Sequence, residues 1–320
     1  MVNSTAILLC VAASLGLTEG FVAFRGFRTW YRIVGSNQEP TKLPVVALHG
    51  GPGASHDYLE PLGDLASTGR RVIFYDQLGG AGNSDRPHDP SMWTVDLYKD
   101  ELATVIRELA LEQYHLFGSS WGGMLAMEHA LTRPQGLASL VIASSPSSMP
   151  QWVAEANRLR LELPRENQEV LLRHEAAGTT SGPEYEHAVL LFYQRHVCRL
   201  DPWPDCVVRA FAKLQQYPEV YNTMNGPSEF HVIGTLKDWD ITERLGEIRV
   251  PTLVASGEFD EATPEINETV HRRIKGSESV IFPNCSHMAF VEEPERYLEV
   301  LNDFFHRVER TRVQSLTSNR

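Results

Sequence analysis

The sequence predicts the α/β fold class: a mostly parallel sheet with helices on both faces and a helical cap insertion. Short apolar runs that suit buried strands alternate with segments whose apolar residues recur at helical spacing. The strand signals vanish between about residues 145 and 229, where helical spacing dominates. Because the alternation resumes afterwards, the helical stretch interrupts one sheet domain instead of following it.

The strand predictions rest on short runs of apolar and β-branched residues between turn residues. Residues 21–24 and 29–34 suit an N-terminal hairpin, and the fully apolar run 45–48 suits a strand that is buried on both faces. The other predicted strands are residues 71–75, 114–117, 137–143, 252–256 and 279–282.

Helices are predicted where apolar residues lie three and four positions apart. These segments are residues 92–111, 124–131, 189–197, 265–274 and 294–308. We therefore expect an α/β core of residues 21–144 and 236–310 around a helical cap of residues 145–235. Residues 1–20 are expected to form an N-terminal extension and residues 311–320 a C-terminal tail.

The composition is that of a globular protein and argues against nucleic acid as a partner. Hydrophobic residues occupy 42% of the 320 positions, and 29 Lys+Arg against 41 Asp+Glu give a formal net charge of -12. Affinity for the phosphate backbone of nucleic acids comes from Lys and Arg, so this acidic balance disfavours nucleic-acid binding. None of the four cysteines forms a CxxC pair or stands at zinc-ligand spacing with histidine. We predict no metal, no cofactor and mostly unpaired thiols, with a Cys198–Cys206 bridge only in an oxidising compartment.

The first segment bears on localisation. Residues 6–17 form a mostly apolar run that is shorter than the roughly 20 residues needed to cross a bilayer. The length suits the core of a signal peptide, but no Lys or Arg occurs before Arg25. We expect an extension of a cytoplasmic protein without a stable membrane span, and a secreted protein if residues 1–20 act as a signal peptide.

The chemistry begins at Gly118-Ser119-Ser120-Trp121-Gly122, a G-x-S-x-G motif between a predicted strand and a predicted helix. That context is required of a nucleophile elbow, in which a tight turn exposes the serine hydroxyl. The pentapeptide alone also fits an ordinary Gly/Ser turn, and the flanking strand and helix favour the elbow. Ser120 is therefore the predicted nucleophile.

A serine hydroxyl needs a base, and in this architecture the partners follow in the order Ser, Asp or Glu, His. Asp260 lies just beyond the predicted strand 252–256, and His287 lies just beyond the strand 279–282. Each alone would be read as a turn or surface residue, but their joint order favours a triad. We predict that His287 is the general base and acid and that Asp260 orients it.

Acyl transfer also needs hydrogen-bond donors for the developing oxyanion. His49-Gly50-Gly51-Pro52-Gly53 follows the strand 45–48, and its glycines allow the backbone to approach a reacting carbonyl. We predict that the backbone N–H groups of Gly51 and Trp121 form the oxyanion hole. The loop is not a phosphate loop, because no Gly-Lys-Ser/Thr follows it.

Together these motifs resemble the proline iminopeptidase (prolyl aminopeptidase) family of α/β-hydrolase serine peptidases, across residues 20 to 308. The resemblance rests on His49-Gly-Gly-Pro-Gly53, Asp76-Gln77 with Gly79 and Ser84, Gly118-Ser-Ser-Trp-Gly-Gly123 and the triad order. Three further segments are most similar to the branch of the tricorn-interacting aminopeptidase, which is broader than proline in specificity. They are Ser55-His-Asp-Tyr58, Asn225-Gly-Pro-Ser-Glu-Phe230 and Gly234-Thr-Leu-Lys-Asp-Trp-Asp240. Leu78 departs from the Arg that is common after Asp-Gln, which leaves the preference for proline open.

The resemblance implies that carboxylates hold the free α-amino group of the substrate. By motif match these are Glu229 and Glu261, which an isolated reading would leave as surface glutamates. A buried ammonium needs compensating charge, and two carboxylates would reject an acylated N-terminus. Aromatic residues of the insertion are candidates for the lid side of the pocket, although most aromatics in such a segment belong to a core. They are Phe192, Tyr193, Trp203 and Tyr221.

The predicted function is a serine aminopeptidase that releases proline or another small or apolar N-terminal residue from short peptides through an acyl-enzyme. One alternative is an amino-acid amidase, or an esterase or lactonase of the same fold that acts on a small metabolite. Another is a hydrolase-like binding protein without catalysis. An epoxide hydrolase or dehalogenase is disfavoured, because those enzymes resemble this fold with Asp at the elbow. The expected partners are short peptides or amino-acid amides.

Overall fold

The computed structural model describes residues 16–36, 39 and 41–318. Within these residues the strands form one sheet in the order β1-β2-β4-β3-β5-β6-β7-β8. The hairpin β1–β2 and the pair β2–β4 are antiparallel, and the remaining neighbours are parallel. The strands are β1 Leu17–Phe24, β2 Phe27–Val34, β3 Val45–Leu48, β4 Val72–Tyr75, β5 Tyr114–Ser119, β6 Leu137–Ala143, β7 Thr252–Gly257 and β8 Glu278–Phe282. The predicted α/β class with a mostly parallel sheet is confirmed.

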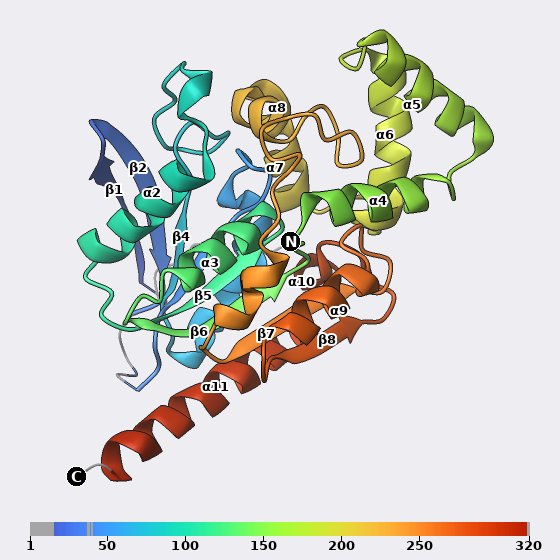
Figure 1. Cartoon of the computed structure of the whole chain (residues 1–320). Coiled ribbons are helices and arrows are strands. Elements are labelled where there is room, and N and C mark those ends of the chain that lie inside the picture. The colour runs from blue at the N-terminus through green and yellow to red at the C-terminus, as the bar shows by residue number, and fades with distance from the viewer. Residues whose placement is uncertain (1–15, 37–38, 40, 319–320) are drawn as a thin grey trace, which may run out of the picture.

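Both faces of the sheet are covered, which explains why the central strands are apolar without alternation. In β3, Val46 and Leu48 belong to one buried cluster, whereas Val45 and Ala47 belong to another on the opposite face. The first face is covered by α2 (Val95–Glu108), α3 (Trp121–Leu131), η3 (Thr242–Glu247) and α9 (Pro264–Arg273). The second is covered by η1 (His56–Thr68), α10 (Ala289–Glu292) and α11 (Pro294–Ser318). Figure 1 shows this layered core, with α11 projecting beyond the sheet.

The segment between β6 and η3 is helical, as the loss of strand signals predicts. It contains α4 Met149–Arg160, α5 Arg165–Ala177, α6 Pro183–His196, α7 Asp205–Gln216 and α8 Glu219–Met224. Helices α4, α5 and α6 lie together at one side of the core (Figure 1) and share a small apolar cluster of their own. Phe192 and Phe230 lie in that cluster. Helix α7 instead packs against η1 of the core.

The element boundaries differ from the prediction at both ends of the chain. Strand β1 begins at Leu17 and not at residue 21, because it pairs along its whole length with β2. Helix α11 runs to Ser318, so the predicted end at residue 308 is wrong and most of the expected tail is helical. Residues 1–15 lie outside the described residues, and with them most of the apolar run.

Two further observations bear on the sequence predictions. Among the described residues, no helix is both long and apolar enough to cross a membrane. Cys198, Cys206 and Cys285 are free thiols in the structure, and Cys198 and Cys285 are buried.

Helix α2 carries a fully buried carboxyl group that ties it to the sheet. Glu101 accepts hydrogen bonds from Thr29 Oγ1 at 2.5 Å and from the Leu78 backbone N–H at 2.9 Å. Burial raises the pKa of Glu101 to about 8 despite these bonds. The protonated form is therefore favoured by the folded state more than by the unfolded chain.

This shift predicts a pH-dependent stability. A carboxyl group whose pKa is raised by folding stabilises the protein below its ordinary pKa, and this contribution is lost as the pH rises towards about 8. Glu101→Gln should flatten the decline between pH 5.5 and 7.5 by up to about 1.4 kcal/mol per pH unit. Denaturant unfolding across this range measures it, with Glu108→Gln at the exposed end of α2 as control. Equal slopes for wild type and Glu101→Gln would contradict the prediction.

Candidate active site

Ser120 stands at the sharp turn between β5 and α3. Its backbone has φ 58° and ψ -125°, a conformation that residues other than glycine rarely adopt. The turn is held by a 2.9 Å hydrogen bond from the Ser120 N–H to the carbonyl of Ala143 at the end of β6. A Cβ at Gly122 would collide with the Leu48 carbonyl, so only glycine fits behind the turn. These features are those of a nucleophile elbow.

Asp260 and His287 follow the carboxyl ends of β7 and β8, and the structure brings them together. His287 Nδ1 lies 2.8 Å from Asp260 Oδ1, and both side chains are buried. The same carboxyl group accepts backbone N–H groups from Ala262 at 2.8 Å and Gly257 at 3.3 Å. A carboxylate with this many donors fixes the Nδ1–H tautomer of His287 and leaves Nε2 free to take a proton.

The end of β6 anchors both Ser120 and His287. The Ser120 N–H donates to the Ala143 carbonyl, and Ser144 Oγ donates to the His287 carbonyl at 3.0 Å. Ser120 and His287 are therefore attached to consecutive residues of one strand end. Such an attachment restricts movement, because it uses a backbone carbonyl at the end of a central strand and the buried hydroxyl of the residue that follows it.

The C-terminal end of α6 holds the same loops from the cap side. The His196 carbonyl accepts the backbone N–H groups of Glu261 and His287, both at 3.2 Å. The His196 ring lies with Nδ1 2.8 Å from the Phe259 carbonyl. His196 therefore has a structural role that links the cap to the site.

The glycine-rich loop after β3 approaches Ser120 closely. A Cβ at Gly50 would lie 2.9 Å from the Cβ of Ser120, so a side chain there would displace Ser120. The Gly50 N–H donates to the hydroxyl of Tyr58 at 2.6 Å, and burial raises the pKa of Tyr58 to about 12. Gly51 follows with φ 109° and lines the same cavity as Ser120 and Trp121. Gly51 and Trp121, the residues of the two predicted oxyanion donors, thus line one cavity with Ser120.

That cavity is predominantly apolar. Apart from the oxyanion loop and the elbow, it is lined by Met124, Pro146, Met149, Trp152 and Leu236, with Asn225 and Glu229 as polar residues. Apolar walls exclude water and strengthen electrostatic interactions with the few polar groups present. The arrangement suits a small, uncharged side chain beside a group that interacts with Glu229.

Glu229 is fixed from two directions. Tyr221 Oη donates to Glu229 Oε1 at 2.6 Å, and Trp152 Nε1 donates to the Glu229 carbonyl at 2.7 Å. The Trp152 ring also packs edge-on against His287, with 6.1 Å between ring centroids. Burial raises the pKa of Glu229, and the Tyr221 hydrogen bond and the His287 charge offset only part of that rise.

Glu261 is buried beside His287. Its Oε1 lies 3.7 Å from His287 Nδ1, and its Oε2 has no hydrogen-bond partner among the described residues. Burial raises the pKa of Glu261 well above its usual range, and the charges of Glu229 and Asp260 raise it further. Carboxyl groups that lie close together and are largely shielded from water create a site that favours a cationic group.

The cap fixes the segment that carries Glu229. Arg160 and Glu175 form an ion pair at 2.9 Å in which both side chains are nearly buried. Tyr185 Oη contacts the same Glu175 at 3.3 Å and the hydroxyl of Ser228 at 3.0 Å. Ser228 directly precedes Glu229, so helices α4, α5 and α6 together position this carboxylate.

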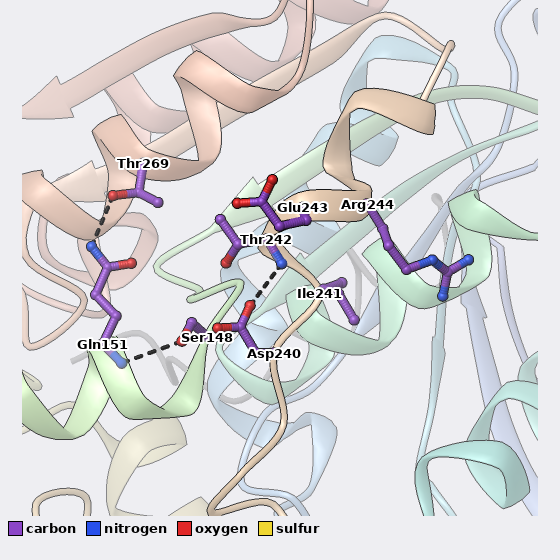
Figure 2. Close-up of a pocket in the computed structure, with 8 residues that line it drawn as sticks. All are labelled: Ser148, Gln151, Asp240, Ile241, Thr242, Glu243, Arg244 and Thr269. Atoms are coloured by element: carbon purple, nitrogen blue, oxygen red, sulfur yellow. Dashed lines mark hydrogen bonds between the residues drawn. The ribbon is translucent and has the colours of Figure 1, made fainter.

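A second hollow lies at the surface, where α4 and α9 meet the loop before η3 (Figure 2). It shares no residue with the cavity at Ser120 and contains no member of the Ser-His-Asp arrangement. Two of its side chains bond each other, Gln151 Nε2 to Thr269 Oγ1 at 2.8 Å. The hollow is lined by Ser148, Gln151, Asp240, Ile241, Thr242, Glu243, Arg244 and Thr269. The cavity at Ser120 is therefore the candidate active site.

Comparison with known proteins agrees with this geometry. A family model described as the alpha/beta hydrolase fold matches residues 44–294. A proline iminopeptidase of Saccharolobus solfataricus is 43% identical over 299 residues, which cover 92% of this chain and 94% of that protein. The chain belongs to the proline iminopeptidase family of α/β hydrolases. The resemblance and the α/β-hydrolase fold that the motifs predict are confirmed.

Solved structures extend the similarity to the whole fold. The proline iminopeptidase of Mycobacterium smegmatis superimposes with a TM-score of 0.85 at 43% identity, covering 92% of this chain and 99% of that one. VinJ superimposes with a TM-score of 0.88 at 46% identity, covering 91% of this chain and 99% of that one.

Leu78, where the chain departs from the family pattern, lies in the core. Its side chain is fully buried in the apolar cluster beneath α2, and its N–H donates to Glu101. It does not line the cavity at Ser120.

The aromatic candidates of the insertion separate into distinct groups. Tyr221 contacts Glu229, whereas Phe192 lies in the cap core and Trp203 packs beside α7 and the second face of the sheet. Tyr193 packs against Phe192 and Phe211, with ring centroids at 6.4 and 5.7 Å. The sequence reasoning missed Tyr58 and Trp152 as site residues. Tyr58 could have been found, because it belongs to the segment directly after the glycine-rich loop, but Trp152 carries no local signal.

Proposed function

We propose that this protein is a serine aminopeptidase that releases one N-terminal residue from short peptides through an acyl-enzyme. Membership of the proline iminopeptidase family supports the hydrolase class. The observation that carries the proposal is a pair of carboxyl groups at the site: Glu229, which is partly buried and lines the Ser120 cavity, and Glu261, which is buried beside His287. A general esterase has no need of buried negative charge at this position.

The proposed reaction has two balanced steps. Ser120 Oγ attacks the first carbonyl carbon while His287 Nε2 takes the hydroxyl proton, and the N–H groups of Gly51 and Trp121 stabilise the oxyanion. The C–N bond then breaks, and His287 returns the proton to the leaving amine. Water attacks the acyl-enzyme by the same route, which releases the amino acid and restores Ser120. Asp260 stabilises the imidazolium in both steps.

The carboxylate pair determines which end of the substrate binds at the site. Glu229 and Glu261 would hold the α-ammonium group, whose charge offsets the repulsion that raises the pKa of Glu261. A substrate with an acylated N-terminus would leave both carboxylates buried without a cation, which is costly. The apolar walls around Met124, Met149 and Leu236 favour proline or another small or apolar first residue.

The substrate panel that tests this proposal contains prolyl, alanyl and leucyl arylamides with free N-termini, the same compounds N-acetylated, and simple aryl esters. Turnover confined to the free-amine compounds supports the aminopeptidase. Comparable turnover of acetylated compounds or plain esters would instead support an amidase, esterase or lactonase. Absence of any turnover and of fluorophosphonate labelling at Ser120 would support a binding protein.

The cytoplasm stays the proposed compartment, resting on the lack of basic residues before Arg25.

Substitution of either glutamate should act selectively on free-amine substrates. For Glu229→Gln and Glu261→Gln, kcat/KM on prolyl arylamide should fall on the order of 10² to 10³-fold, since losing one partner of a buried charge pair costs about 2–5 kcal/mol. Any residual rate on an aryl ester should change little. The matched control is Glu128→Gln, a buried glutamate of α3 that bonds Trp239 away from the cavity. Equal losses on both substrate types would contradict the amine-binding role.

A further inference from the structure

The side chain of Gln77 lies between the two segments that supply the proposed oxyanion donors. Its Nε2 donates to the carbonyl of His49 at 3.0 Å, and its Oε1 accepts the indole N–H of Trp121 at 2.8 Å. His49 begins the loop that contains Gly51, and Trp121 directly follows the nucleophile. One amide group therefore bridges both sides of the oxyanion hole.

The backbone of Gln77 makes a second connection to the same loop. The Gln77 N–H donates to His49 Nε2 at 3.0 Å, so His49 carries its proton on Nδ1, which lies 3.0 Å from the Gly50 carbonyl. Burial lowers the pKa of His49, which favours this neutral ring. Gln77 thus holds His49 through both its ring and its backbone carbonyl, and the His49 ring in turn contacts the Gly50 carbonyl.

Residues on either side keep Gln77 in place. The N–H of the following Leu78 donates to the buried Glu101, and the Gln77 carbonyl accepts the Gly80 N–H at 3.2 Å. The preceding Asp76 accepts both the backbone N–H of His56 at 2.8 Å and its ring at 2.9 Å. The segment is therefore rigid before it contacts the oxyanion loop.

Only a primary amide satisfies both contacts. The Gln77 amide offers its NH₂ to the His49 carbonyl and its oxygen to the Trp121 indole N–H. A reversed amide would place its NH₂ against the indole N–H and its oxygen against the carbonyl. A carboxylate would accept from Trp121 but would face the His49 carbonyl with a second oxygen. A methionine of similar size would leave a buried carbonyl and a buried indole N–H without partners, each costing about 1–3 kcal/mol.

We propose that Gln77 is a positioning residue that sets the distance between the Gly51 and Trp121 N–H groups, so that both reach the same oxyanion. This inference rests on the proposed function for the assignment of those two donors. An oxyanion forms only during turnover, so Gln77 acts on kcat and leaves substrate binding almost unchanged.

The test compares wild type with Gln77→Glu and Gln77→Met on a prolyl arylamide. We expect kcat to fall about 10 to 100-fold, less than the 10² to 10³-fold of a deleted oxyanion donor, with KM within about twofold. The inhibition constant of a prolyl boronic acid, which forms a tetrahedral adduct with the serine, should rise by a similar factor. Fluorophosphonate titration of active sites and thermal unfolding separate this effect from loss of folded protein.

Each of three kinetic results would overturn the proposal: an unchanged kcat, a KM that changes in place of kcat, or a lower kcat with unchanged boronic acid affinity. A titrated site fraction that falls in proportion to kcat would also overturn it in favour of a structural role. If the Gln77 variants do not fold, Trp121→Phe removes one end of the bridge and keeps the backbone N–H. Unchanged kcat and boronic acid affinity in that variant would equally refute the role.

The outcome can be separated from a failure of the proposed function. Absence of wild-type turnover on free-amine arylamides would count against the aminopeptidase. The same variants could then be compared on an aryl ester, because every acyl transfer at Ser120 needs the oxyanion hole.

Discussion

Replacement of Ser120 by alanine is expected to reduce turnover by a factor on the order of 10⁶ while the fold is retained. The serine side chain makes no hydrogen bond that caps α3, and the turn is held by backbone contacts that alanine preserves. Its Oγ is the atom that forms the covalent bond to the acyl carbon in the proposed mechanism. Without it, His287 and Asp260 have no nucleophile to activate.

The measurement is kcat on a prolyl arylamide, with circular dichroism and thermal unfolding to verify the fold. The matched control is Ser119→Ala, which removes a neighbouring buried hydroxyl at the end of β5. This control should keep turnover within about tenfold of wild type, because it lies outside the proton-transfer route. Turnover near the wild-type rate by folded Ser120→Ala would exclude Ser120 as the nucleophile.

Replacement of Asp260 by asparagine is expected to lower kcat by about 10⁴-fold, the effect of a wrong histidine tautomer in a serine triad. Both oxygens of Asp260 already accept backbone N–H groups, and one of them also accepts His287 Nδ1. An asparagine NH₂ at either position would oppose one of these donors. The ring of His287 would then lose the orientation that leaves Nε2 available to Ser120.

The rate loss is measured as kcat on the same arylamide, together with the rate of fluorophosphonate labelling, which reports activation of the serine. Asp240→Asn, in the surface hollow shown in Figure 2, is the control for removal of an aspartate outside the site. A decrease in kcat smaller than about tenfold for Asp260→Asn would mean that Asp260 does not orient the base.

The residues that could be predicted are those whose position follows from local order along the chain. A nucleophile elbow is a strand, a turn and a helix in immediate succession, so Ser120 could be found from its neighbours. Asp260 and His287 each follow a strand, and parallel strands present their carboxyl ends at one edge of a sheet. Their 2.8 Å contact in the structure has this origin.

The residues that could not be predicted are those brought in by segments with no fixed relation to the sheet. Trp152 contacts both Glu229 and His287, yet it comes from the first turns of a cap helix whose path over the core no local pattern encodes. Gln77 belongs to a motif that the sequence shows, but its bridging contacts depend on the loop after β3 and the elbow meeting at one point.

The sequence alone therefore determined the α/β fold, the order of its elements and the chemical type of the site, because these follow from hydrophobic periodicity and from motifs that are local along the chain. The tertiary structure alone decided which other side chains surround Ser120, Asp260 and His287. It placed the partly buried Glu229 near the buried Glu261 and joined His49 to Trp121 through Gln77. The raised pKa values of the two glutamates and the bridging contacts of Gln77 depend on burial and on through-space distance. Both arise only when segments far apart in the chain pack together.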